Sequence, residues 1–459
     1  MGILAREGYE LTPRADEAEV LVVNTCSFIE PAQKESVDAI LEMAEHKKFG
    51  AAKKLIVAGC LVERFREQIL DQIPEVDAVV GTGEVERILE AVEGDLRALP
   101  AQPPAFLYHD LTPRVITTPR HAAYIKIAEG CDHPCSFCII PQLRGKFRSR
   151  RFESVVREAE SLAAAGTREI TLIGQDTTSY GEDLGPRDGL AQLLEKLARV
   201  EDLLWVRFLY AYPNRVTQRL LDTLAAHPRL AKYMDMPLQH ASRNVLARMK
   251  RGSHGDAFLK LLERIRRTIP GVALRTSFIA GFPGETEEDF KELCDFVRAA
   301  NLDWMGVFEY SDVDNAASYA LAEKVDAETM THRRNRLMAI QKKISREKLR
   351  LLRGQTVVAL VEGPSRENPL VWEARLEGMA PDIDGKVYLT DIELSGGEVA
   401  SAGDAVRVSI TKTDAYDAIG RVVDILPRPA RREISARSAA PGPEALTRIA
   451  TGAPLRELA

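Results

Sequence analysis

The 459-residue sequence has no run of about 18 consecutive apolar residues, so no membrane-spanning helix is expected. Residues 1–19 also lack the apolar core of a secretory signal peptide. An excess of positive charge is missing as well, since the formal net charge is −6 and the isoelectric point is about 5.9. Proteins that bind nucleic acid mainly by bulk electrostatics carry clustered positive charge instead. These absences argue against a membrane protein, a secreted protein and a generally cationic nucleic-acid binder.

Cysteine is scarce, since the chain has six, which is few for a disulfide-stabilised scaffold. In a chain without a signal peptide, such cysteines are more typical of metal or redox ligands than of disulfides. A reducing compartment suits both that role and an oxygen-sensitive metal centre. We therefore expect a cytoplasmic protein that uses cysteines as ligands.

Three of the six cysteines, Cys131, Cys135 and Cys138, stand together in the run AEGCDHPCSFCIIP, and the next one downstream is Cys294. A cubane iron–sulfur cluster normally takes four thiolates, so three would leave one iron open. An open coordination position distinguishes catalytic centres from closed structural ones. Structural zinc, with His133 or a distant residue as fourth ligand, is the alternative, but zinc sites usually arrange cysteines in separated pairs. The spacing favours an iron–sulfur cluster with an open iron.

Residues 1–100 are predicted to form an α/β domain. The runs EVLVVNTC (residues 19–26) and KLIVAGC (54–60) are nearly continuous β-branched segments, typical of parallel strands buried on both faces. A helical pattern lies between them, which completes a βαβ unit. Cys26 and Cys60 each end a strand and are expected at the carboxyl edge of the sheet, where open α/β sheets place their sites. The alternative is a pair of buried cysteines that act as small hydrophobes.

Residues 117–352 contain six strand-then-helix repeats. The candidate strands are AYIKIAE, REITLIG, WVRFLY, YMDMPLQ, ALRTSFIAG and WMGVFEY, and a basic helix follows them. Repeated βα units of about 30 residues imply a parallel sheet, either barrel-like or doubly wound. Six units are too few to close an eight-stranded barrel. Cys294 shares a helical stripe with Phe290, Leu293 and Val297, so it is predicted to be a core residue.

Residues 353–427 change to short alternating strands with Gly-rich turns: TVVALVE, GKVYLT, DAVRVSIT and AIGRVVDIL. This pattern predicts a small all-β barrel. Residues 428–459 are rich in Arg, Ala and Pro and have little periodicity, so we expect a disordered tail there. The chain is therefore predicted to have three folded domains and a tail.

The Cys-x-x-x-Cys-x-x-Cys run resembles that of the radical S-adenosylmethionine superfamily, in which the open iron binds the amino and carboxylate groups of that cofactor. The flanking RGKFRSR and the domain order resemble the methylthiotransferase branch, most closely its RimO type. The resemblance implies an N-terminal methylthiotransferase α/β domain, an open (βα)6 partial TIM barrel and a C-terminal TRAM barrel. It also implies that Cys131, Cys135 and Cys138 hold the catalytic 4Fe–4S cluster.

The resemblance further implies a second 4Fe–4S cluster, because NTC and AGC match the family's ligand positions at Cys26 and Cys60. The family carries a third ligand just after an earlier strand near its N-terminus, and this sequence shows neither that strand nor that cysteine. Loss of a central strand would leave backbone groups unpaired. We therefore expect a misassigned start codon, with the strand and a cysteine encoded upstream, rather than a genuine two-cysteine cluster.

Three loops at the expected carboxyl ends of barrel strands resemble family positions that border S-adenosylmethionine. They are IGQDTTSYG after the second strand, MPLQH at the end of the fourth and GFPGET after the fifth. Side chains at these ends face the cavity of such a barrel, and glycines allow close backbone approach to a ligand. The ordinary alternatives are loop formers, a structural histidine and a tight turn with Thr286 as helix cap. The expected cofactor-binding residues are Gln175, Asp176, Gln239, His240, Gly281 and Gly284.

Basic residues form a run directly after the three clustered cysteines. By default such a run is a solvated face, and a second role would be to stabilise an anionic cofactor and a reduced cluster. The residues are Arg144, Lys146, Arg148, Arg150 and Arg151.

The resemblance implies the following reaction. S-adenosylmethionine is cleaved to methionine and a 5′-deoxyadenosyl radical, which removes hydrogen from the β-carbon of an aspartate of small-subunit ribosomal protein S-twelve, on or near the ribosome. Sulfur carried on the second cluster, methylated by another cofactor molecule, then bonds to that carbon. An electron donor such as a flavodoxin or ferredoxin is implied as a partner. The alternatives are the MiaB type, which modifies isopentenyladenosine of tRNA, and a non-catalytic iron–sulfur or RNA-binding module.

The charge of the third domain favours a protein substrate over tRNA. Between residues 354 and 427 thirteen acidic residues oppose six basic ones, a net charge of −7. A domain that held tRNA phosphates would need the opposite sign. An acidic surface is complementary to a cationic ribosomal protein and would speed their encounter. The segments APDIDGKVY, DAYD and YAYPNRV also resemble the ribosomal-protein branch, and the alternative is that the acids only keep the domain soluble.

Overall fold

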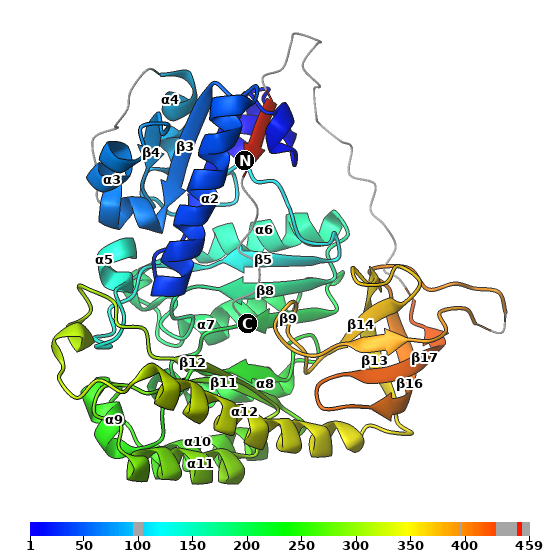
Figure 1. Cartoon of the computed structure of the whole chain (residues 1–459). Coiled ribbons are helices and arrows are strands. Elements are labelled where there is room, and N and C mark those ends of the chain that lie inside the picture. The colour runs from blue at the N-terminus through cyan, green and yellow to red at the C-terminus, as the bar shows by residue number, and fades with distance from the viewer. Residues whose placement is uncertain (95–103, 395, 428–447, 452–459) are drawn as a thin grey trace.

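The computed structural model describes residues 1–94, 104–394, 396–427 and 448–451. Three bodies are visible in Figure 1: an N-terminal α/β domain, a central domain with parallel strands, and a small β-barrel. None of the described helices is long and apolar enough to span a membrane. The three bodies correspond to the three predicted domains.

The N-terminal domain contains a five-stranded parallel sheet with helices around it (Figure 1). The strand order is β1 (Glu10–Thr12), β18 (Arg448–Thr451), β2 (Val20–Thr25), β3 (Lys54–Gly59) and β4 (Ala78–Val80). The helices are α1 (Gly2–Arg6), α2 (Glu30–Phe49), α3 (Cys60–Gln72) and α4 (Ile88–Glu93). In β2, four successive residues from Val20 to Val23 are buried, because helices cover both faces of the sheet. The predicted βα unit is therefore confirmed.

Strand β18 differs from the disordered tail that we expected over residues 428–459. Its backbone pairs in parallel with both β1 and β2, with Ile449 opposite Val20. The side chain of Ile449 is fully buried beside Leu4 and Val22. Four residues of the tail therefore form an internal strand next to β2, and the rest of the tail lies outside the described residues. Apolar burial and backbone pairing explain why this short segment is ordered despite its weak periodicity.

The central domain has six parallel strands in two adjoining sheets. One sheet contains β5 (Ala122–Lys126), β8 (Glu169–Ile173) and β9 (Trp205–Phe208), and the other contains β10 (Tyr233–Asp235), β11 (Ala273–Ala280) and β12 (Trp304–Glu309). A parallel bridge between Val206 and Leu230 joins the two sheets. All six candidate strands are thus confirmed, in the order of an open barrel.

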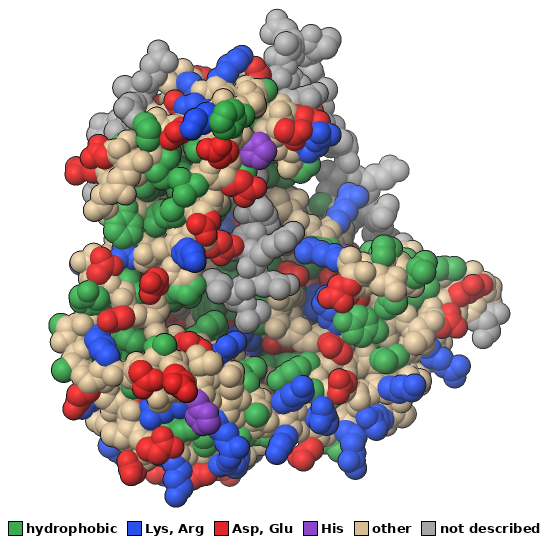
Figure 2. Space-filling view, viewed as in Figure 1, with side chains coloured by type: hydrophobic (Ala, Val, Ile, Leu, Met, Phe, Trp, Pro, Cys, Tyr) green, Lys and Arg blue, Asp and Glu red, His purple; other side chains and the backbone are tan. Residues whose placement is uncertain are grey.

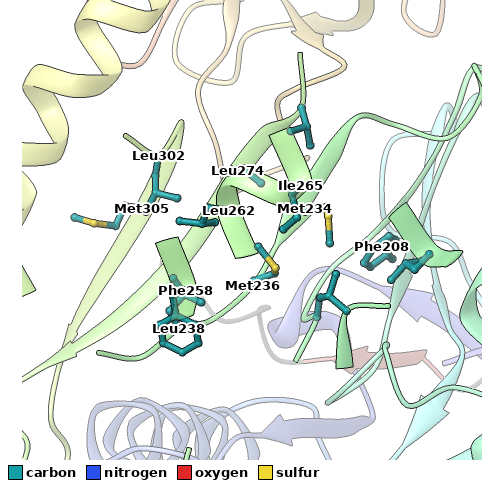
Figure 3. Close-up of a cluster of buried hydrophobic side chains, with 14 of the residues drawn as sticks. Phe208, Met234, Met236, Leu238, Phe258, Leu262, Ile265, Leu274, Leu302 and Met305 are labelled. Atoms are coloured by element: carbon teal, nitrogen blue, oxygen red, sulfur yellow. The ribbon is translucent and has the colours of Figure 1, made fainter. Parts of the chain in front are cut away.

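Helices surround this open barrel. They are α6 (Phe152–Ala164), α7 (Gly189–Leu197), α8 (Gln218–Ala226), α9 (Arg243–Arg248), α10 (Gly255–Thr268), α11 (Glu287–Ala300) and α12 (Ala327–Arg350). Two short strands, β6 (Ala128–Glu129) and β7 (Arg148–Ser149), and helix α5 (Ile140–Arg144) follow β5. Figure 3 shows part of the core between strands and helices, where Phe208, Met234 and Leu274 are almost fully buried. Cys294 is also buried in this core, as predicted.

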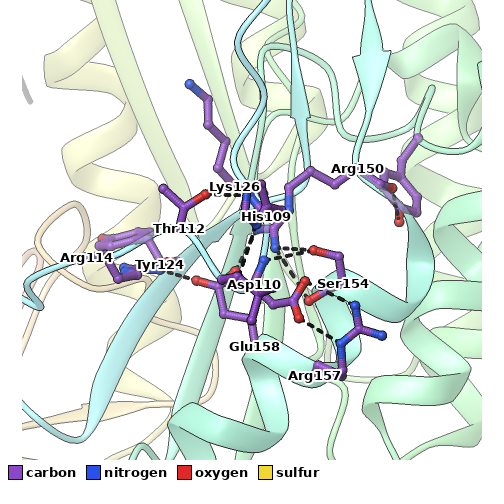
Figure 4. Close-up of polar contacts among 12 residues, drawn as sticks. His109, Asp110, Thr112, Arg114, Tyr124, Lys126, Arg150, Ser154, Arg157 and Glu158 are labelled. Carbon is purple, nitrogen blue, oxygen red and sulfur yellow. Dashed lines mark hydrogen bonds and ion pairs between the residues drawn. The ribbon is translucent and has the colours of Figure 1, made fainter. Parts of the chain in front are cut away.

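An irregular segment, residues 104–121, leads from the N-terminal domain to β5 and lies against α6 (Figure 4). The Arg157 guanidinium donates from Nε to Asp110 Oδ2 at 2.7 Å, and the Asp110 backbone N–H donates to Ser154 Oγ at 3.0 Å. Arg114 and Arg150 both donate to the buried carboxylate of Glu158 at 2.6 Å. Arg150 is therefore a buried structural residue, which contradicts the solvated face expected for its basic run.

The third domain is a closed five-stranded barrel with the order β13-β14-β15-β17-β16. The strands are β13 (Thr356–Pro364), β14 (Trp372–Leu376), β15 (Val387–Leu389), β16 (Ala405–Thr413) and β17 (Ala418–Ile425). The all-β barrel is confirmed, and β14 is a strand that the sequence patterns did not reveal. Figure 2 shows basic side chains over α12 and the lower part of this barrel, and acidic side chains at its outer tip.

The small barrel contacts the amino ends of the central strands. Trp304 and Tyr233, which begin β12 and β10, donate to Gly378 O at 2.6 Å and to Asp384 Oδ2 at 2.7 Å. In Figure 1 the small barrel accordingly lies at the opposite end of β5 and β8 from α5. The carboxyl ends of the central strands face the N-terminal domain, because Ser311, just after β12, accepts a hydrogen bond from the Glu30 backbone.

Buried ion pairs hold the small barrel on the central domain. Glu169, the first residue of β8, accepts from Arg375 of β14 at 2.5 Å and from Arg207 at 2.8 Å. Arg375 also binds Glu362 at 2.7 Å, and His121 lies 3.0 Å from that second carboxylate. Burial alone would raise the pKa of Glu169, but Arg375 and Arg207 outweigh it and hold the pKa below its usual value. Glu169 is therefore an ionised group at the domain contact.

Candidate metal centre

The three clustered cysteines lie in one loop at the carboxyl end of the central strands. This loop follows β5 and β6, and all three thiols are partly exposed. The Gly130 backbone donates to Gln175 Oε1 at 2.8 Å, the Cys131 backbone to Gly145 O at 3.3 Å, and the Ser136 backbone to Met249 O at 3.1 Å. Contacts from two other strand–helix units thus fix the loop, because Gln175 follows β8 and Met249 follows α9.

The thiols of the loop influence one another electrostatically. Burial raises the pKa of Cys131 to about 11 and that of Cys138 to about 12, and each is also raised by the charge of Cys135. Neighbouring sulfurs therefore disfavour further thiolates in this loop unless a positive group joins them. Such a set of sulfur donors suits a cationic iron–sulfur core.

His133 is fixed in place by two neighbours. Its Nε2 lies 2.6 Å from Asp176 Oδ2, and its ring stacks on Tyr212 with a centroid distance of 3.7 Å and an interplanar angle of 8°. Asp176 is buried, which would raise its pKa, but hydrogen bonds from His133, Ser179 and Thr178 keep the pKa below its usual value. Within the described residues, no three His, Cys, Asp or Glu side chains converge as a single-ion site. The structure gives no support to a zinc site with His133 as ligand.

The loop after β8 supports the cysteines rather than forming an isolated turn. Gln175 fixes the backbone beside Cys131, and Asp176 fixes His133 between Cys131 and Cys135. Thr177 Oγ1 donates to Leu209 O at 2.7 Å, which ties this loop to the end of β9. Gln175 and Asp176 are therefore brought together with the cysteines, as the sequence analysis expected.

Gln239 and His240, the pair at the end of the fourth strand, are fixed by hydrogen bonds to neighbouring residues. Gln239 continues the sheet with a backbone φ of +72° and donates its N–H to Ser277 O at 2.9 Å. His240 is fully buried, and its imidazole is not open to solvent. Its Nδ1 accepts the Ser242 N–H at 3.0 Å, while its Nε2 has no hydrogen-bond partner and lies 3.7 Å from Glu285 Oε2. Burial lowers the pKa of His240 to about 3, which keeps the imidazole neutral.

The glycine loop after β11 forms a tight turn. Gly281 and Gly284 have φ values of +78° and +80°, in the left-handed region that favours glycine. A Cβ at Gly281 would lie 2.1 Å from the Met330 side chain, and one at Gly284 would lie 2.2 Å from Arg248. Protein side chains, rather than open space, therefore occupy the room beside both glycines. Thr286 caps α11 in a capping box with Asp289, as the sequence predicted.

Cys26 and Cys60 lie together at the carboxyl edge of the N-terminal sheet. Their preceding residues, Thr25 and Gly59, are direct partners in the parallel β2–β3 register. Cys60 is buried against Ile139 and Leu143, so it contacts the segment that directly follows the three-cysteine run across the domain contact. Both cysteines are therefore placed at the sheet edge that the sequence predicted.

Arg144 links the two groups. Its Nη2 donates to Cys60 Sγ at 3.2 Å, and its Nη1 binds Glu129 Oε1 at 3.3 Å. Burial raises the pKa of the Cys60 thiol, and Arg144 opposes that shift. Arg144 is thus engaged with a sulfur and is not part of a solvated face.

Two residues beside the cysteine loop escaped the sequence analysis. Arg251, beyond the end of α9, donates from Nη1 to Cys135 Sγ at 3.4 Å. Tyr212, beyond the end of β9, carries the guanidinium of Arg251 over its ring at 4.3 Å. Tyr212 lies in the segment YAYPNRV, which was noted only for its resemblance to the ribosomal-protein branch, and no local signal in the sequence pointed to Arg251.

Comparison with known proteins identifies all three domains. Residues 1–81 match the uncharacterized protein family UPF0004, residues 125–297 the radical SAM superfamily, and residues 354–423 the TRAM domain. The ribosomal protein uS12 methylthiotransferase RimO of Solibacter usitatus is 63% identical over 92% of this chain and 90% of its own length. The chain belongs to the RimO family of radical S-adenosylmethionine methylthiotransferases.

A second relative agrees with this membership. The protein of the same name from Koribacter versatilis is 55% identical, with 92% of each chain covered. A solved structure of the radical S-adenosylmethionine methyltransferase TsrM from Kitasatospora setae has a TM-score of 0.49 and 18% identity, and covers 63% of this chain and 64% of its own. The three-domain fold and the enzyme class predicted from the sequence are therefore confirmed by the relatives.

Proposed function

We propose that this enzyme transfers a methylthio group to the β-carbon of an aspartate of ribosomal protein uS12. The observation that carries the proposal is the three-cysteine loop at the carboxyl ends of the central strands, in a chain 63% identical to a RimO protein. Carboxyl strand ends are where barrels of this kind place their catalytic groups. The reaction is inferred from the relatives, which are named ribosomal protein uS12 methylthiotransferases, and from the resemblance of the sequence motifs to that branch.

We further propose that Cys131, Cys135 and Cys138 hold a 4Fe–4S cluster with one open iron. Three partly buried cysteines in one loop, with the charged forms of Cys131 and Cys138 disfavoured by burial, fit a site completed by a positive core. When bound, the cluster supplies the electron that cleaves S-adenosylmethionine to a 5′-deoxyadenosyl radical. The chain itself orients the loop through Gln175 and Asp176 and shields it with the N-terminal domain.

Cofactor contacts are proposed mainly for the loop after β8. Gln175 and Asp176 lie beside the cysteines, so small shifts in these side chains would reach a ligand on the open iron. Gln239 would contribute through its backbone, because its positive φ is fixed by pairing with β11. Gly281 and Gly284 would act by shaping the turn, and His240 by supporting it from within the core.

Cys26 and Cys60 are proposed as ligands of a second cluster. Their adjacent positions and the hydrogen bond from Arg144 to Cys60 Sγ support a site for an anionic sulfur-ligated group. The contact of Cys60 with Ile139 supports a position for this site next to the first cysteine loop. A sulfur carried there would therefore start close to the place where the substrate radical forms.

The cluster assignment can be tested with a matched pair of cysteine variants. Cys135→Ala removes one proposed ligand, whereas Cys294→Ala removes a buried cysteine of the α11 core. After anaerobic reconstitution, we expect Cys135→Ala to lose 5′-deoxyadenosine formation and most of the iron of this site, and Cys294→Ala to keep both. Equal 5′-deoxyadenosine formation by the parent and Cys135→Ala would contradict the assignment.

The uS12 substrate is supported by the relatives more strongly than by charge. Seven of the thirteen acidic residues of the small barrel are exposed, and four of its six basic residues are exposed. The negative excess on its surface is therefore smaller than the sequence suggested. The barrel also lies at the amino ends of the central strands, opposite the cysteine loop. Its acidic tip would therefore attract a cationic protein at a distance rather than hold the target aspartate.

A competition experiment decides between uS12 and tRNA as the substrate. The reconstituted enzyme is given uS12, assembled small ribosomal subunits and tRNA that contains isopentenyladenosine, and each product is analysed by mass spectrometry. We expect a methylthio group on an aspartate of uS12, free or in the subunit. Its appearance only on tRNA adenosine would overturn the proposal in favour of the MiaB type.

A further inference from the structure

The side chain of Arg251 is fixed against the cysteine loop by several contacts. Its Nη2 donates to Pro237 O at 2.6 Å, and its Nη1 donates to Cys135 Sγ at 3.4 Å. Its backbone carbonyl accepts from Asn214 Nδ2 at 3.0 Å. The residue is 7% exposed, so water has little access to the guanidinium. A buried cation is therefore aimed at one sulfur of the three-cysteine loop.

The Tyr212 ring holds this guanidinium in place. Arg251 lies over the ring at 4.3 Å, and the His133 imidazole stacks on it at 3.7 Å. Two groups this close cannot occupy the same side, so the ring is sandwiched between them. His133 is fixed in turn by the carboxylate of Asp176. The chain Arg251–Tyr212–His133–Asp176 therefore clamps the cysteine loop between two strand–helix units.

Arg251 brings a positive charge into contact with a sulfur of the three-cysteine loop. Its guanidinium carries a permanent positive charge, as arginine side chains do in proteins. A hydrogen bond to a ligand sulfur and a nearby positive charge both favour the more negative, reduced state of an iron–sulfur centre.

We infer that Arg251 is a positioning residue that raises the reduction potential of the Cys131–Cys135–Cys138 centre through its hydrogen bond to Cys135. This inference rests on the cluster assignment proposed above. Reduction adds one electron, delivered by a low-potential donor protein, and Arg251 neither gains nor loses a proton. The residue lowers the energy of the reduced state in a partly buried site, where an added negative charge is otherwise costly.

The test is a redox titration of the reconstituted full-length enzyme, followed by electron paramagnetic resonance in the absence of S-adenosylmethionine. The variants are Arg251→Met, which removes charge and donor, and Arg248→Met, which removes an arginine three residues away that pairs with Glu323 and does not contact a cysteine. We expect Arg251→Met to lower the equilibrium constant for one-electron reduction at least tenfold, which shifts the reduction potential by about 59 mV to a more negative value. Arg248→Met is expected to match the parent.

A second pair of variants covers the case in which Arg251→Met does not fold. Tyr212→Phe keeps the ring and its two stacking partners, whereas Tyr212→Leu removes the platform of the guanidinium. We expect the potential of Tyr212→Phe to equal that of the parent and the potential of Tyr212→Leu to fall. Equal potentials for the parent and Tyr212→Leu would count against the inference.

Two further outcomes are informative. If Arg251→Met changes only the affinity for S-adenosylmethionine and leaves the cofactor-free potential unchanged, the inference is overturned and Arg251 is a cofactor ligand. If the parent itself assembles no iron–sulfur cluster, the proposed function fails, and that failure is read from its iron content and visible absorption before any titration.

Discussion

Replacement of Arg375 by Met tests the buried contact between the small barrel and the central domain. Arg375 is 3% exposed and binds Glu169 at 2.5 Å and Glu362 at 2.7 Å. Without it, Glu169 keeps Arg207 as a single partner, and Glu362 keeps His121. Removal of one partner from a buried ion pair costs about 3–5 kcal/mol, because the other charge stays desolvated. We expect the Arg375→Met variant to lose stability by that amount.

The assay is urea unfolding followed by tryptophan fluorescence, because Trp304 and Trp205 both pack at this domain contact. A multidomain chain need not unfold in one step, so the transition that releases the small barrel is compared between variants. The matched control is Arg407→Met, which removes an exposed arginine of the same barrel that lies 3.6 Å from Asp424. An exposed pair of this kind contributes at most about 1 kcal/mol.

The double variant Glu169→Gln, Arg375→Met makes the test sharper. If both residues act through the same buried pair, the combined loss of stability is smaller than the sum of the single losses. Strict additivity, or an Arg375→Met loss no larger than that of Arg407→Met, would refute the reasoning. Either result would mean that apolar contacts alone hold the small barrel.

Three further predictions follow from local contacts. Ile449→Ala should lower the free energy of unfolding of the N-terminal domain by about 2–4 kcal/mol, and an unchanged thermal midpoint would show that β18 does not pack there. Burial lowers the pKa of His240 to about 3, whereas the same histidine in the unfolded chain takes up a proton below about pH 6.5. The free energy of unfolding therefore falls as the pH drops from 7 to 5. Urea unfolding at both pH values should show that His240→Asn removes about 2 kcal/mol of this loss. Thr286→Ala should cost about 1 kcal/mol through loss of the α11 cap and Thr286→Ser much less, as measured by thermal unfolding.

The sequence by itself determined the domain order and the cysteine chemistry. The spacing of Cys131, Cys135 and Cys138 is a local property of the chain, and one loop after β5 holds all three. The strands that end at Cys26 and Cys60 could also be predicted from the sequence, because buried parallel strands have long apolar runs that few other structures share. Thr286 directly precedes α11, so its role as a helix cap could be considered from the sequence, whereas the capping box with Asp289 was found in the structure.

Only the tertiary structure decided contacts between residues far apart in the chain. Arg251 and Cys135 are 116 positions apart, and no periodicity or spacing joins them. The buried Glu169–Arg375 pair, 206 positions apart, looks like two ordinary surface charges in the sequence. Ile449 belongs to a segment that was predicted from the sequence to be disordered, but its strand pairs between β1 and β2. Local patterns fix elements and short motifs, whereas the partner of a charge or of a strand edge depends on how the whole chain packs.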